Sequence, residues 1–224
     1  MTDAIQMACV TLALFCVHQV FSATPTPAHA TSCEKKEGSK QSSRDVRLWR
    51  LGFWLACGIG MLSKGLATIA LIGLPLALLA ISSKNYQRLW HALWCWHGLL
   101  LAALVAVPWY GMAESAYPGF LNYFFIGEHW MRFTHPGWSG DQYGHAHRYP
   151  LGMIWIFWAI AILPWLWIFI RLAWRTLRPT AWAELNEAQR LLWCACLAPL
   201  LFFTFSSNII LTYPLTAIPP FAVL

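Results

Sequence analysis

The chain has 224 residues, of which 58% are hydrophobic and only 11% are charged. A soluble domain carries about 25% charged residues, so this composition excludes an ordinary soluble protein and indicates an integral membrane protein. The net charge of +6 does not indicate nucleic-acid binding, because the basic residues are distributed along the chain as membrane topology would place them.

Long apolar segments recur along the whole chain. About 20 such residues cross a bilayer as a helix, and we predict passes at about residues 4–23, 48–62, 66–81, 91–110, 151–170 and 191–206, with a seventh beginning near 214. We expect Pro164-Trp165 to kink the fifth of these passes. The predicted fold is all-α: residues 1–224 form a single transmembrane domain, a polytopic helical bundle with a helical or irregular external loop.

The basic residues fall mainly between alternate apolar segments. Residues 24–47 are rich in Pro, Ser, Thr and Lys and are predicted to be a solvated cytoplasmic linker. Twelve of the fifteen Lys and Arg residues lie in segments 24–50, 82–90 and 171–190, which share one face if every apolar segment crosses. Because positive loops stay in the cytoplasm, residues 111–150 are predicted to be an external loop of an inner-membrane protein.

Charged and aromatic residues alternate in the segment from Pro108 to Pro150. Arginine pairs with phosphate groups, and sugars stack on aromatic faces, so this segment suits a charged or sugar-bearing membrane lipid. The alternative is an amphipathic loop at the membrane interface, where Trp and Tyr gather without binding a substrate.

Lys64 lies in Ser63-Lys64-Gly65, between two apolar segments. A lysine in the middle of the bilayer costs about 2.5–3.5 kcal/mol, so we predict two helices that meet in a turn at the membrane face. The side chain of this lysine either extends to the membrane interface without a further role or belongs to a functional site.

The seven cysteines include no CxxC pair, and their spacing indicates neither disulfides nor a metal site. His145 and His147 share one side of an extended segment and could be interfacial or metal-binding.

Five short stretches also occur in a recognisable order. They are Thr2-Asp3-Ala4; Met61-Leu62-Ser63-Lys64-Gly65; the loop with Pro108-Trp109-Tyr110, Pro118-Gly119-Phe120, Tyr123 to His129 and Arg132-Phe133; His147 to Pro150 with Leu163-Pro164-Trp165; and Ser206 to Leu215. In this order they resemble the polytopic GT-C glycosyltransferases that use polyprenyl-phosphate sugars. Aminoarabinose transferases acting on lipid A and protein O-mannosyltransferases belong to this group. The resemblance covers nearly the whole chain except residues 24–44.

The resemblance implies a transfer of a sugar from a polyprenyl-phosphate donor to an envelope acceptor, lipid A or protein, on the external face. It implies catalytic roles for Asp3 and Glu128, donor-phosphate binding by Lys64 and Arg132, and acceptor or substrate contacts from His129, His147, Arg148 and Tyr213. A divalent metal is left open, with Glu128 and His129 as its candidate ligands.

Two departures from the family pattern qualify these expectations. The family's catalytic acid lies in a first external loop, usually as one of an acidic pair. No such pair precedes Asp3 here. The family also often has a basic residue near Ile209 and a proline near Thr216, and both differ here. We therefore expect a central fragment that catalyses no transfer by itself. Two alternatives remain: a transporter-like module for the same lipid-linked sugar, and a membrane subunit without chemistry.

The charge distribution makes a direct prediction about orientation. Cys33 should lie in the cytoplasm and Asp141 outside. In a variant that keeps only Cys33, a membrane-impermeant maleimide should label the protein after permeabilisation and not in intact cells. Labelling in intact cells would show that the predicted orientation is wrong.

Overall fold

The computed structural model describes residues 2–24, 38–83, 86–135, 138, 140, 147–206 and 208–224. Cys33, Asp141 and His145, about which the sequence made predictions, lie outside the described residues. Every regular element in the described part of the chain is a helix, which confirms the predicted all-α fold.

The helices follow one another with short connections. The first half contains α1 (Thr2–Ala23), α2 (Gly38–Lys64), α3 (Leu66–Ser83), α4 (Tyr86–Leu93) and α5 (Trp96–Ala116). The second half contains α6 (Phe120–Asn122), the π-helix η2 (Tyr123–Met131), α7 (Arg132–Thr134), α8 (Met153–Ala161), α9 (Leu166–Thr176), α10 (Pro179–Glu184), α11 (Glu187–Thr204), the 3₁₀-helix η3 (Tyr213–Ala217) and α12 (Ile218–Val223).

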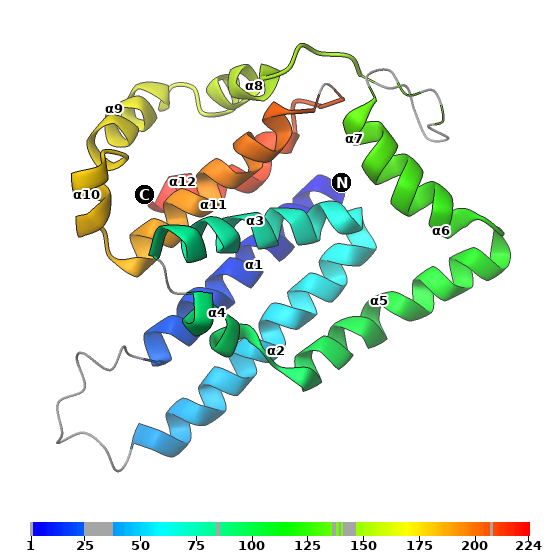
Figure 1. Ribbon diagram of the computed structural model, residues 1–224, viewed down its shortest axis with the longest axis horizontal. Helices are drawn as coiled ribbons and strands as arrows, with labels where there is room; N and C mark the ends of the chain where they lie inside the picture. The colour runs from blue at the N-terminus through cyan, green and yellow to red at the C-terminus, as the bar shows by residue number, and fades with distance from the viewer. Residues whose placement is uncertain are drawn as a thin grey trace.

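Helices α1, α2, α3 and α11 form the centre of the molecule (Figure 1). Helix α1 packs mainly against α2, and α3 packs against α11. Small side chains such as Ala13, Val17 and Ala198 are fully buried there, which lets the helices approach closely. Helix α5 runs along one edge beside α2, and α8 to α10 form an arc along the opposite edge (Figure 1).

Three of the predicted passes are recovered as helices α1, α3 and α5, each long and apolar enough to cross a membrane. These helices fit a multi-pass membrane protein. Helix α2 begins at Gly38, inside the segment predicted to be a linker, and so is longer than the pass expected at 48–62.

The predicted pass at 91–110 has wrong boundaries, because the chain breaks at residues 94–95 and α5 then continues to Ala116. Side chains from α2 stabilise this break by capping the C-terminal end of α4. Arg50 donates to the carbonyls of Ala92 (2.7 Å) and His91 (2.9 Å), and Trp54 Nε1 donates to the carbonyl of Leu93 (3.0 Å). Carbonyls at a helix end have no partner within the helix, and no pattern in residues 91–110 shows that α2 supplies one.

The predicted pass at 151–170 is divided into two helices. Helices α8 and α9 are bent by 116° at a break over residues 162–165, so this segment is either a broken span or a re-entrant one. The break lies at the predicted position, because Pro164 lacks an amide hydrogen and its ring clashes with the preceding helical turn.

The predicted turn at Lys64 is present, between α2 and α3. Gly65 has a φ of +58°, a conformation that glycine adopts without the steric cost of a side chain. The two helices then run close together, and the buried hydroxyl of Thr68 donates to the carbonyl of Gly60 at 2.9 Å. The turn is therefore held by a hydrogen bond one helical turn away from it.

This close contact leaves no room for a side chain at Gly60, where an added Cβ would lie 2.4 Å from Thr68 Cγ2. Gly60→Ala should lower the thermal melting temperature of the purified protein, because overpacking costs about 1–3 kcal/mol. Gly73→Ala is the matched control, since a Cβ at Gly73 in α3 meets nothing within 4 Å. Equal melting temperatures for the two variants would contradict the packing described here.

Candidate functional site

A cavity of about 310 Å³ lies where the start of α1, the α2–α3 turn, η2 with α7, and the loop after α11 meet. Phenylalanine side chains form much of its wall. Its polar lining residues come from all of these elements: Gln6, Lys64, Glu128, His129, Arg132, Ser206, Asn208 and Tyr213. The site thus combines an apolar wall with a small group of convergent polar side chains, as binding sites for small molecules do.

Lys64 is paired with a carboxylate at this cavity. Its Nζ lies 2.7 Å from Asp3 Oδ1, and the Thr212 hydroxyl donates to Asp3 Oδ2 at 3.0 Å. Lys64 Nζ also lies 5.8 Å from the centre of the Tyr213 ring, within the range of a cation–π contact. These contacts join the start of α1, the end of α2 and the segment that leads into η3.

Arg132 is paired with a second carboxylate. Its Nη1 donates to Glu128 Oε2 at 2.6 Å, and the other oxygen of Glu128 accepts a hydrogen bond from the Tyr123 hydroxyl. The π-helix explains this arrangement, because its backbone hydrogen bonds connect residues five apart and so bring Tyr123 next to Glu128. Both carboxylate oxygens are therefore engaged.

His129 connects η2 to the α2–α3 turn. Its Nδ1 lies 2.7 Å from the Phe124 carbonyl oxygen, again five residues away, and its Nε2 lies 3.1 Å from the Lys64 carbonyl oxygen. Both ring nitrogens thus face backbone carbonyls. The imidazole ring of His129 therefore lies between η2 and the backbone of Lys64.

The same contacts bear on the metal that the sequence left open. The side chains of Glu128 and His129 face different partners, as their neighbouring positions on a helix require. Among the described residues, no three His, Cys, Asp or Glu side chains gather as they would around a metal ion. In this arrangement Glu128 and His129 do not fit a shared metal site.

Five of the eight predicted site residues line the cavity: Lys64, Glu128, His129, Arg132 and Tyr213. Asp3 reaches it through its ion pair with Lys64. His147 and Arg148 are exposed and are not among the lining residues, so their predicted role stays a prediction. Sequence reasoning missed the buried polar residues Gln6, Ser206 and Asn208. The sequence signal for the last two was the stretch from Ser206 to Leu215, one of the five that carry the family resemblance.

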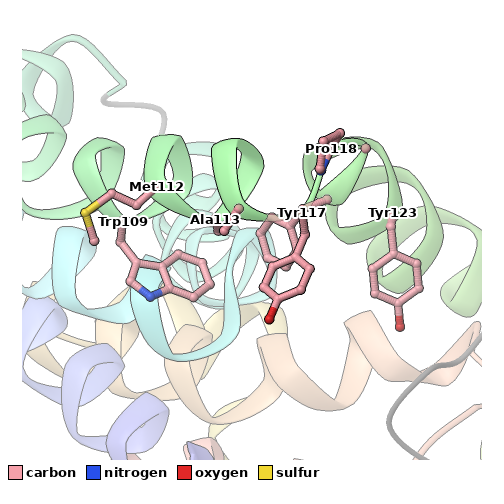
Figure 2. A pocket seen from close by; sticks show the side chains of 9 residues that line it. Trp109, Met112, Ala113, Tyr117, Pro118 and Tyr123 are labelled. Carbon is pink, nitrogen blue, oxygen red and sulfur yellow. The ribbon is translucent and has the colours of Figure 1, made fainter.

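A second, larger hollow of about 830 Å³ lies where α5 ends and α6 begins. Trp109, Tyr117 and Tyr123 point to the same side of the two helices (Figure 2). Glu114 holds this corner by accepting hydrogen bonds from the amides of Gly119 (2.9 Å) and Leu121 (2.8 Å). Tyr123 belongs to both sites, since its ring lines the hollow and its hydroxyl contacts Glu128.

Comparison with known proteins shows the family to which this chain belongs. Residues 1–124, more than half of the chain, match the model described as dolichyl-phosphate-mannose-protein mannosyltransferase. The chain belongs to this family. Its members include the protein O-mannosyltransferases that the sequence motifs resemble, so the predicted glycosyltransferase family is confirmed.

Similar relatives are undecaprenyl phosphate-alpha-4-amino-4-deoxy-L-arabinose arabinosyl transferases. The one from Sodalis glossinidius is 32% identical over 83% of this chain and 31% of its own length. One from Pseudomonas fluorescens is 34% identical over 78% of this chain and 29% of its own length. The chain therefore spans about a third of the length of the relatives it matches.

The fold of this family member is similar to that of a solved structure. The crystal structure of ArnT from Cupriavidus metallidurans bound to undecaprenyl phosphate superposes with a TM-score of 0.75 at 24% sequence identity. The match covers 100% of this chain and 35% of that one. The predicted GT-C-like helical fold is confirmed by this likeness.

Gly65 allows a test of the contact between η2 and the turn. An added Cβ would lie 2.6 Å from Phe124 Cε1 and 2.7 Å from His129 Nε2, in addition to the strain of a positive φ, which costs about 1–3 kcal/mol. Gly65→Ala should therefore push His129 away from Lys64. Hydrogen–deuterium exchange should become faster at residues 61–66 and 123–129.

Gly119→Ala is the matched control for backbone strain. Gly119 has a φ of +92°, but a Cβ there meets nothing within 4 Å. This variant should leave exchange at residues 61–66 unchanged. The contact would be unimportant if both variants changed exchange at the turn to the same extent.

Proposed function

We propose that this chain forms the donor-lipid site of a membrane glycosyltransferase. The enzyme transfers a sugar from a polyprenyl-phosphate donor to an envelope acceptor, lipid A or protein, on the external face of the inner membrane. The observation that carries the proposal is the cavity at the ends of apolar helices in which Lys64 and Arg132 converge, each beside a carboxylate.

The chemistry of the donor explains the two cations. When the bond between the sugar and the phosphate oxygen breaks, negative charge grows on the leaving phosphate. Cations that are already in position stabilise this charge without a reorganisation cost. Arg132 offers a planar fork that fits two phosphate oxygens, and Lys64 adds a compact charge.

The two carboxylates suit the acceptor side of the same reaction. A hydroxyl of the acceptor attacks the anomeric carbon and must lose its proton, which Asp3 or Glu128 can accept as a general base. A phosphoryl group of lipid A is already anionic and needs less help from a base. A phosphate that binds Lys64 or Arg132 also competes with the carboxylate paired to that cation, and this competition would release the carboxylate for proton transfer.

The relatives support the class of donor. Their names specify an undecaprenyl phosphate-linked aminoarabinose as the substrate, and the structure with the same fold is bound to undecaprenyl phosphate. The external location of the site is supported by the concentration of Lys and Arg in the segments that alternate with residues 111–150. Exposed His147 and Arg148 lie near the end of that external segment and would contact the acceptor. Tyr213 on the cavity wall would contact bound substrate.

A chimera tests the proposal. This chain replaces the matching third of the Sodalis glossinidius relative, and sugar transfer to lipid A and to membrane protein is followed by mass spectrometry in a strain without its own transferase. The chimera should be active. Arg132→Lys in it should lower transfer about tenfold or more, because lysine keeps the charge and loses the bidentate contact.

Arg171→Lys is the matched control, because Arg171 is an exposed arginine on α9 and does not line the cavity. It should leave transfer unchanged. A membrane-inserted chimera without activity would refute the proposed function. Normal transfer by Arg132→Lys would make Arg132 an interfacial residue outside the phosphate site.

A further inference from the structure

Asn208 is a buried amide in the loop between α11 and η3. Only 5% of the residue is exposed, and it lines the cavity that contains Lys64 and Arg132. Its Oδ1 accepts a hydrogen bond from the backbone amide of His147 at 3.0 Å. This contact sets the orientation of the side chain, because only the oxygen of the amide can accept from an N–H group.

The other end of the same side chain has no such contact. Among the described residues, Asn208 Nδ2 is a buried donor without a hydrogen-bond partner. Leaving a buried donor unsatisfied costs about 1–3 kcal/mol, and native structures contain few such groups. Because Asn208 lines the cavity, an acceptor on a ligand bound there is the partner that this covered donor could gain once the side chains around it move.

The charges around Asn208 indicate what this acceptor is. Lys64 and Arg132 each already contact a carboxylate, Asp3 and Glu128 respectively, so an arriving anion must compete for both cations. Asn208 Nδ2 has no acceptor to give up. The ligand oxygen must be an acceptor, since the amide nitrogen can only donate, and every oxygen of a phosphate group that is not esterified accepts hydrogen bonds.

We propose that Asn208 Nδ2 donates a hydrogen bond to a phosphate oxygen of the polyprenyl-phosphate donor, as an uncharged binding group beside Lys64 and Arg132. This assignment rests on the proposed function. Because Oδ1 stays bound to the His147 amide, the same residue fixes the start of segment 147–150 to the phosphate site. The loop between α11 and η3 thus becomes part of the donor site.

The test compares two variants of the 224-residue chain in detergent micelles. Asn208→Asp keeps an oxygen that can accept from His147 and replaces the donor with an anionic oxygen. Asn208→Ala removes the donor without adding charge. Affinity is measured for undecaprenyl phosphate and for undecaprenol, which has the same hydrocarbon chain and no phosphate.

We expect the wild-type chain to prefer undecaprenyl phosphate. Asn208→Ala should weaken its binding about tenfold, as the loss of one hydrogen bond to a charged group does, and Asn208→Asp should weaken it further. Binding of undecaprenol should stay the same in both variants, which also shows that they are folded. Affinity of Asn208→Ala for undecaprenyl phosphate within about twofold of wild type would overturn the assignment.

Thr216→Val is the matched control. Thr216 is equally buried, and its hydroxyl also lacks a partner among the described residues, but it lines a different, apolar cavity of about 430 Å³. This variant should not change the preference for the phosphate lipid, and a comparable loss in it would also overturn the specific role of Asn208. A wild-type chain that bound both lipids equally would refute the proposed function itself, which separates that failure from the failure of this inference.

Discussion

The ion pair between Lys64 and Asp3 is the interaction on which the rest of the site depends. A lysine between two apolar helices needs either water or a counter-charge, and here it has a carboxylate from the start of α1 at 2.7 Å. The turn at Gly65 allows α2 and α3 to fold back on each other, so that Lys64 lies at the end of both helices. His129 then binds the Lys64 carbonyl and places η2 beside the same turn.

The π-helix supplies the second half of the cavity. Its five-residue spacing brings Tyr123 to Glu128 and Phe124 to His129, and Glu128 in turn orients Arg132. Irregular helices of this kind occur frequently at functional sites. The result is two cations held in place by two carboxylates, an arrangement that is nearly neutral before a phosphate arrives and that restricts where the phosphate can bind.

Much of the fold could be predicted from sequence because the signals are local. Runs of apolar residues predicted α1 and α3 closely, and the Lys64-Gly65 pair predicted the turn that joins α2 to α3. The shifted boundaries at residues 91–110 and the size of the bend within 151–170 have a different origin. Composition shows that a segment is apolar, but it does not show that Arg50 and Trp54 cap a break forty residues away, nor how far a chain bends at Pro164.

The sequence by itself determined the class of protein, the positions of the membrane-spanning helices α1 and α3, and a list of candidate residues that includes five on the cavity wall. These follow from hydropathy and from short motifs, which need no knowledge of distant contacts. Only the tertiary structure decided which charges are paired, that Glu128 and His129 contact different partners, and that Asn208 keeps a buried donor without a partner among the described residues. Those properties depend on distances between residues far apart in the chain, and the packing of α1, the α2–α3 turn, η2 and the loop after α11 sets these distances.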